Sequence, residues 1–179
     1  MKGWAKLMWP PAIVMSVAGP AYATEYLSIE EAQKLAFPEA VRFDEANIIY
    51  KSSDVAGIES LSGQKVRTQG EQIWRAQSAG RLLGWFIVDY VIGKHLAIDY
   101  AVALDPDGRV LMVEILNYRE SYGGEIANKD WLQQFVGKKP GDPVELGQDV
   151  TSISGATLSS EHLAEGIRRV LAIYSTCLK

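Results

Sequence analysis

The pattern of hydrophobic and polar residues is most regular near the carboxyl end of the chain. Apolar residues recur there at i, i+4, i+7, i+8 and i+11 and form one stripe, which consists of Leu163, Ile167, Val170, Leu171 and Tyr174. The other face carries acidic residues first and basic residues later, as the helix dipole favours: Glu161, Glu165, Arg168 and Arg169. We therefore predict an amphipathic C-terminal helix with both arginines on its polar face.

The middle of the chain has the pattern of β-strands. Segments 73–79, 83–91, 97–104 and 109–116 are candidate strands, of which 83–91 is the richest in β-branched and aromatic residues. Asp105-Pro106-Asp107-Gly108 separates the last two, and this is turn chemistry, because proline presets φ and glycine accepts a positive φ. These features predict an antiparallel meander of three or four strands.

Two shorter helices are predicted outside the meander. Ser28 and Glu31 have the spacing of a capping box, and the helix they open is expected to end near Phe37, before Pro38. Asn128 is expected to cap a short second helix. The polar stretch from Lys51 to Gly63 is predicted to be a loop or irregular segment, and Lys138-Lys139 a solvated turn. Helices around a strand meander predict a single α+β domain.

The first 23 residues differ from the rest of the chain. Lys2 and Lys6 precede a mostly apolar stretch at 7–17, and Ala21-Tyr22-Ala23 has the small-x-small pattern that signal peptidase accepts. We predict a signal peptide at 1–23, cleaved after Ala23, which would place the mature protein in the periplasm or another extracytoplasmic compartment. The alternative is an uncleaved anchor. An uncleaved anchor would hold the protein at the membrane. A cleaved protein would reach the membrane only through a partner.

Composition narrows the classes of function. The chain has 179 residues with 18 basic and 22 acidic side chains, a net charge of −4 that argues against nucleic-acid binding. Its single cysteine excludes an internal disulfide framework and a cysteine-based metal cluster. The two histidines, His95 and His162, suggest neither a metal site nor a catalytic triad, so we predict no catalytic residue of these kinds and no metal.

The candidate chemistry lies just before the last helix, in Ser154-Gly155-Ala156-Thr157-Leu158-Ser159-Ser160. Small residues allow another molecule to approach the backbone, and the first turn of a helix offers unpaired N–H groups that favour a phosphate. A run of Ser, Thr and Gly before a helix is also ordinary capping composition. From the residues alone, both an anion site and a simple helix cap remain open.

The same residues resemble the S/T-G-A-T-x-[ST]-S motif of the FMN-binding domain family, which includes the flavin-bearing periplasmic subunits of the sodium-translocating NADH:quinone reductase and of Rnf complexes. The resemblance implies that the Thr157 hydroxyl carries FMN through a phosphoester, made from FAD by a flavin transferase. It implies that neighbouring residues surround the phosphate: Ser154, Gly155, Ala156, Leu158 and Ser159.

The resemblance covers roughly residues 82–171. Glu120-Ser121-Tyr122, followed by two glycines, resembles the family's E-T-x-G-x-G loop, which implies that these three residues lie near the flavin ring. Trp131 and Phe135 resemble the W-x-x-x-F helix that follows the loop. We therefore divide the chain into the signal peptide, an N-terminal helix and irregular segment at 24–79, and an FMN-binding domain at 80–175.

One departure from the family concerns flavin attachment. The family usually has an aspartate six residues before the acceptor threonine, where this chain has Thr151, and the nearest aspartate is Asp149. Attachment through Thr157 and non-covalent FMN therefore remain alternatives.

As a function, the resemblance implies an electron-transfer flavoprotein rather than a self-sufficient enzyme, with a cytochrome or a membrane oxidoreductase as its redox partner. The alternatives are a small flavin-dependent reductase of a diffusible acceptor and a binding or sensory module without redox activity.

Overall fold

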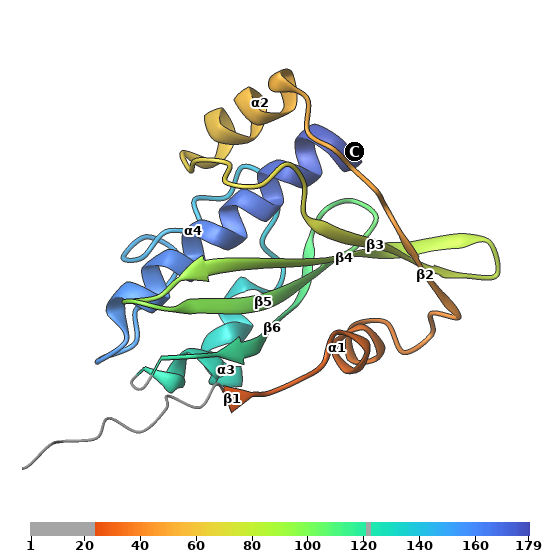
Figure 1. Cartoon of the computed structure of the whole chain (residues 1–179). Coiled ribbons are helices and arrows are strands. Elements are labelled where there is room, and N and C mark those ends of the chain that lie inside the picture. Colours follow the sequence, from red (N-terminus) through yellow and green to blue (C-terminus); the bar gives the residue numbers. More distant parts are fainter. Residues whose placement is uncertain (1–23, 121–122) are drawn as a thin grey trace, which may run out of the picture.

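A computed structural model describes residues 24–120 and 123–179, and its core is a six-stranded antiparallel sheet with the strand order β1-β6-β5-β4-β3-β2 (Figure 1). The strands are β1 (Thr24–Glu25), β2 (Arg42–Glu45), β3 (Gln72–Ser78), β4 (Arg81–Ile92), β5 (Ala97–Leu104) and β6 (Val110–Tyr118). The helices are α1 (Ile29–Ala36), α2 (Ser52–Ser62), α3 (Lys129–Leu132) and α4 (Thr157–Ile173). Two short 3₁₀ helices, η1 (Gly124–Ala127) and η2 (Gln133–Phe135), and a π-helical segment, η3 (Tyr174–Leu178), complete the elements. The predicted single-domain α+β fold with its C-terminal helix is confirmed. The predicted signal peptide at 1–23 lies outside the described residues.

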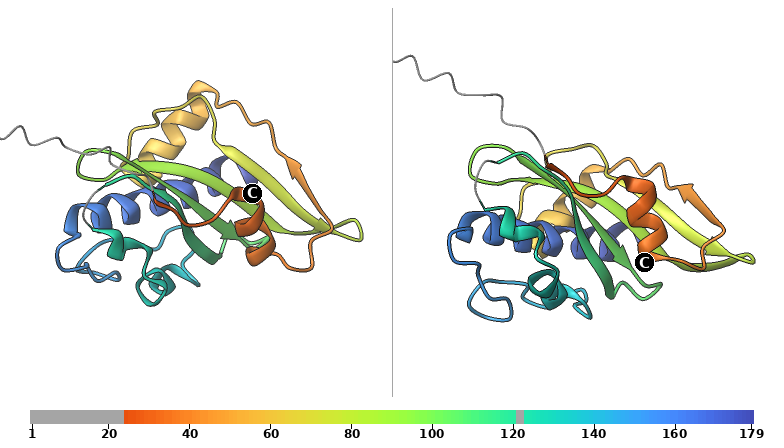
Figure 2. Two further views of the ribbon diagram at one scale, coloured as in Figure 1. Left: turned by 60° about the horizontal axis from the view of Figure 1, so that its bottom comes forward. Right: turned by 90° about the horizontal axis from the view of Figure 1, so that it is seen from below.

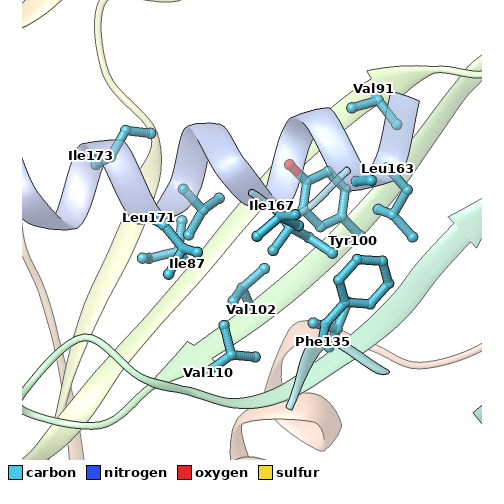
Figure 3. Packing of buried hydrophobic residues seen from close by; sticks show 14 of the residues in the cluster. Ile87, Val91, Tyr100, Val102, Val110, Phe135, Leu163, Ile167, Leu171 and Ile173 are labelled. Atoms are coloured by element: carbon cyan, nitrogen blue, oxygen red, sulfur yellow. The ribbon is translucent and has the colours of Figure 1, made fainter. Parts of the chain in front are cut away.

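Each face of the sheet is covered by helices (Figure 2). Successive side chains of a strand point to opposite faces, and β5 shows this alternation clearly. Tyr100 and Val102 join the larger core, under α4, whereas Ala101 and Ala103 join the smaller core, under α1. Figure 3 shows how α4 lays its apolar stripe across the larger core. The sheet is thus buried on both sides, and α4 is held along much of its length.

The predicted meander is confirmed, and its hairpin is fixed by one side chain. Asp105 Oδ1 accepts hydrogen bonds from the backbone N–H groups of Asp107 and Arg109, at 2.9 and 2.8 Å. The predicted capping box of α1 is present, and Asn128 caps α3 by accepting from Trp131 N at 3.1 Å. These local signals are all contained within a few residues of sequence.

The prediction of a loop over Lys51–Gly63 is wrong, because Ser52–Ser62 forms α2. The Asp54 carboxylate accepts from Lys51 N at 2.8 Å, and Gly63 ends the helix with φ +69°. Ile58 is fully buried and α2 packs against α4. The helix is thus stabilised by its caps and by tertiary packing rather than by a strong apolar stripe.

The predicted polar-face position of Arg169 is also wrong. Its side chain is 9% exposed and its guanidinium lies 2.5 Å from the carboxylate of Asp89, on β4. Arg168 does lie nearer the surface, where its Nε donates to Ser62 O at 2.8 Å. A buried arginine is tolerated here because a buried carboxylate pairs with it.

Candidate functional site

The site is built around the first residue of α4, Thr157. The turn before it reverses the chain with Gly155 at φ +85°, and a Cβ on this glycine would have no atom within 4 Å. Ala156 is the N-cap residue and provides no side-chain capping bond. An N-cap side chain usually accepts a hydrogen bond from an N–H group of the first turn, and alanine cannot do so. The first-turn N–H groups of α4 therefore have no acceptor from the N-cap side chain.

The hydroxyl groups of this segment have different environments. Ser160 is fully buried, and its Oγ donates to Ala156 O at 2.9 Å and accepts from Ile153 N at 3.3 Å. Ser159 is buried and hydrogen-bonds the hydroxyl of Tyr118. Thr157, in contrast, is exposed. Of these three hydroxyl residues, only Thr157 is exposed to another molecule.

A cavity of about 610 Å³ opens beside Thr157. Its lining combines the start of α4 with two other segments and consists of Lys94, His95, Glu120, Gly123, Gly155, Ala156, Thr157, Leu158 and Ser159. The structure thus brings together six of the predicted site residues. Ser154 lies on the exposed turn just before them and is not part of the lining, and Ser121 and Tyr122 lie outside the described residues.

Lys94 and His95 are cavity residues that the sequence did not reveal, whereas Gly123 belongs to the glycine-bearing loop motif, although it was not predicted as a site residue. Lys94 and His95 lie in the turn between β4 and β5, more than 60 residues before Thr157. Only the pairing of β4 with β5 and the position of α4 across the sheet bring this turn to the site. Two basic side chains in a turn between predicted strands were the available signal.

Glu120 lies at the cavity wall, but its carboxylate is turned toward the backbone. Its Oε1 accepts from His95 N and Leu96 N, at 2.5 and 2.8 Å. Desolvation alone would raise the pKa of Glu120, but these backbone hydrogen bonds outweigh it and lower the pKa below its ordinary value. The carboxylate therefore stays ionised at neutral pH.

The loop that leads into the site is held by Asp149. Its carboxylate pairs with Lys138 Nζ at 2.5 Å and accepts from Glu145 N at 2.9 Å. Desolvation raises the pKa of Asp149, but the Lys138 bond and the backbone bonds outweigh it and lower the pKa. The prediction of Lys138-Lys139 as a solvated turn is therefore wrong for Lys138, whose ammonium group is largely buried in this contact.

Thr151 connects the same loop to the helical segment that contains Trp131. Its N–H and its hydroxyl both donate to Gln134 Oε1, each at 2.8 Å, and its carbonyl accepts from Trp131 Nε1 at 2.6 Å. Trp131 is buried against Phe135, with the ring centroids 5.1 Å apart. The path into the Ser154–Thr157 turn is thus anchored on both Lys138 and Trp131.

Comparison with protein families identifies the cofactor of the segment that contains this site. Residues 93–172 match the FMN-binding domain family. The resemblance to this family that the motif indicated is therefore confirmed. The matched segment includes Glu120 and the whole turn from Ser154 to Thr157, and the match assigns FMN as the cofactor of this domain.

The chain is also similar to two curated proteins. The chain is 27% identical over 111 residues to a subunit of the ion-translocating oxidoreductase complex of Stutzerimonas stutzeri, covering 56% of this chain and 49% of that protein. It is 25% identical over 118 residues to a subunit of the proton-translocating ferredoxin:NAD(+) oxidoreductase complex of Clostridium ljungdahlii, covering 62% and 64%. The chain thus spans 49% and 64% of the lengths of these two relatives.

A solved structure has the same fold. The crystal structure of Shewanella oneidensis NqrC superposes with a TM-score of 0.51 and 18% identity, covering 79% of this chain and 70% of that one. Among the residues described here, no helix is both long and apolar enough to cross a bilayer.

The residues at the cavity fit FMN. A phosphate is suited to the uncapped start of a 17-residue helix, where N–H groups and the helix dipole favour an anion. Gly155 leaves open the space that a Cβ would fill, and the exposed Thr157 hydroxyl is within the same lining. A volume of about 610 Å³ lies within the range of ordinary ligand sites.

Proposed function

We propose that this protein is an extracytoplasmic electron carrier that holds FMN covalently on Thr157 and passes electrons between redox partners of a membrane-associated chain. One observation carries the proposal: Thr157 is an exposed hydroxyl residue at the start of α4, and it lines a cavity of about 610 Å³ inside the segment that matches the FMN-binding domain family. The neighbouring Ser159 and Ser160 are buried and bonded, and the exposed Ser154 does not line the cavity, which favours Thr157 as the acceptor.

The proposed attachment is a phosphoryl transfer to the Thr157 side chain. Thr157 Oγ1 forms a bond to the phosphorus of the FMN half of FAD, the bond to the AMP half breaks, and the hydroxyl proton leaves. The product chain gains FMN less one water. The first turn of α4, with the backbone of Leu158 and Ser159, would then hold the phosphate. The bound flavin supplies the redox chemistry, and the protein supplies attachment and orientation.

The loop geometry bears on how a flavin transferase recognises the chain. Asp149 is already committed to Lys138 and to the backbone of Glu145, so it serves to hold the loop. Thr151 is exposed at the position where the family usually has an aspartate. We therefore propose that the transferase accepts this chain with Thr151 at that position rather than through Asp149.

The compartment and the partners follow from two kinds of support. The sequence of residues 1–23 has the pattern of a signal peptide, which supports export. The relatives from Stutzerimonas stutzeri and Clostridium ljungdahlii are named as subunits of ion- and proton-translocating oxidoreductase complexes, which supports a membrane-associated redox partner. Removal of residues 1–23 takes away two lysines and no acid, so the net charge changes from −4 to −6, suited to docking on a basic partner such as a cytochrome.

The proposal is tested by producing the full chain together with a flavin transferase and then denaturing the purified protein. We expect flavin absorbance to stay with the unfolded chain during gel filtration and to be lost in Thr157→Ala. Flavin that separates from the wild-type chain on denaturation would contradict covalent attachment, and a chain that never acquires flavin would contradict the proposed function as a whole.

A further inference from the structure

The turn between β4 and β5 forms the side of the cavity that α4 does not. It is a tight turn, in which Gly93 N donates to Leu96 O at 2.8 Å. Lys94 and His95 stand at its tip, and both are exposed and line the cavity. These are the basic side chains of the cavity lining, so the position of this turn determines where positive charge faces the cofactor.

A single side chain from a distant segment holds this turn. Glu120 lies 24 and 25 residues further along the chain, just after β6, and its Oε1 accepts from the backbone N–H groups of Leu96 and His95 at 2.8 and 2.5 Å. Two charge-assisted bonds from one oxygen to consecutive amides constrain the backbone rather than a side chain. The Lys94 and His95 side chains are left to face the cavity.

Gly93 shows that this contact is closely fitted. A Cβ on Gly93 would lie 3.0 Å from Glu120 Oε1 and 3.0 Å from Ile98 Cδ1. The carboxylate therefore approaches the turn at a point where a larger residue would crowd it. Gly93 and Glu120 together form a clamp on the turn, which we call the Glu120 clamp.

We propose that Glu120 is a positioning residue, which fixes the Gly93–Leu96 turn as a wall of the flavin cavity and acts on the flavin through that turn. The sequence resemblance alone placed Glu120 near the flavin ring, whereas the structure places its bonded oxygen on the backbone of His95 and Leu96. This proposal rests on the proposed function only in taking flavin as the molecule that occupies the cavity. The clamp itself is a property of the chain before flavin attachment.

The clamp predicts different behaviour for two substitutions of the same residue. Glu120→Ala removes both acceptor bonds, so the turn is released. Glu120→Gln keeps a side-chain oxygen that can accept from both amides, so the turn stays in place. Glu125→Ala is the matched control, because Glu125 is an exposed carboxylate nearby for which the described residues show no side-chain hydrogen bond.

The first measurement is amide hydrogen exchange on the full chain without flavin. We expect Glu120→Ala to accelerate exchange at the His95 and Leu96 amides about tenfold or more, with Glu120→Gln and Glu125→Ala close to wild type. Unchanged exchange at both amides in Glu120→Ala would overturn the clamp. Because no flavin is present, this result is independent of the proposed function.

The second measurement is quenching of flavin fluorescence by iodide, on protein shown by its mass to carry flavin. We expect greater quenching in Glu120→Ala, because the released turn exposes the flavin, and wild-type quenching in Glu120→Gln. An equal increase in quenching in Glu120→Ala and Glu120→Gln would show that the carboxylate acts on the flavin directly and would overturn the positioning role. A wild-type chain without flavin would instead contradict the proposed function, while the exchange experiment still decides the clamp.

Discussion

Arg169 on α4 lies 2.5 Å from the Asp89 carboxylate on β4, and both side chains are buried between the helix and the sheet. The same carboxylate oxygen accepts from the Tyr100 hydroxyl at 2.6 Å, and the guanidinium also donates to Tyr90 O at 3.0 Å. This group ties α4 to the centre of the sheet. Thr157 is the first residue of the same helix, so the pair helps to fix the direction from which the helix start meets the cavity.

Breaking this pair should destabilise the fold strongly. Arg169→Met leaves the Asp89 carboxylate buried without its cation, and we expect a loss of about 3–5 kcal/mol in the free energy of unfolding. The double variant Asp89→Asn/Arg169→Met should lose less than the sum of the two single variants, because no uncompensated charge remains. Urea unfolding measures all four proteins, and strictly additive losses would contradict a coupled pair.

Glu71 should make stability depend on pH near neutrality. Burial is the main cause that raises the pKa of Glu71 from 4.5 to about 7, and the nearby charge of Asp89 raises it further. The folded state therefore binds the proton of Glu71 more tightly than the unfolded state does. The resulting contribution of Glu71 to the free energy of unfolding is fully present below pH 4.5 and is lost as pH rises to about 7. The loss is at most about 3 kcal/mol.

The measurement is the difference between wild type and Glu71→Gln in unfolding free energy across that pH range. Other carboxylates, such as Glu120 and Asp149, have lowered pKa values, so their contributions to the free energy of unfolding are lost as pH falls. Only the difference between wild type and Glu71→Gln therefore isolates the effect of Glu71. A difference that does not change between pH 4.5 and 7 would contradict the raised pKa.

Replacing Gly166 with alanine should destabilise the protein, although alanine favours an isolated helix. A Cβ at this position would lie 2.4 Å from Tyr100 Oη and 2.8 Å from Val91 Cγ1, where α4 crosses the sheet. Gly→Ala stabilises an exposed helix by about 1 kcal/mol, whereas overpacking a core costs about 1–3 kcal/mol. We expect Gly166→Ala to lower the midpoint of thermal unfolding, and an increase would show that the helix–sheet contact is loose.

Thr151→Asp should improve flavin incorporation. The substitution restores the acid six residues before Thr157 that the family usually has, while Asp149 keeps its bonds to Lys138 and Glu145 N. Flavin per chain after limited co-production with a transferase measures the effect. The comparison variant Asp149→Ala should lower the free energy of unfolding by about 1–3 kcal/mol, because Lys138 loses its buried partner. Higher incorporation in Asp149→Ala than in Thr151→Asp would reverse the roles we assign to these positions.

The sequence predicted the elements whose signals are local. The capping box at Ser28 and Glu31, the hairpin turn after Asp105 and the apolar stripe of α4 all depend on residues a few positions apart, and all are present. The prediction failed where long-range packing decides. Segment 52–62 is helical although its apolar pattern is weak, because it packs on α4.

The same distinction applies to individual charged residues. Arg169 has the spacing of a polar-face residue, and only its partner 80 positions away accounts for its burial. The side of the cavity formed by the start of α4 was predictable, since Gly155 and Thr157 lie two residues apart in the sequence. The Lys94 and His95 wall was not, because strand pairing and the Glu120 clamp bring it there.

A mass measurement on one peptide tests whether the hydroxyl of Thr157 carries FMN. After co-production with a flavin transferase, trypsin releases a peptide that contains Thr157 and ends at Arg168. We predict that this peptide carries the mass of FMN less one water in wild type and in Ser159→Ala, and that it is unmodified in Thr157→Ala. A modified peptide in Thr157→Ala, or an unmodified one in wild type, would contradict the account.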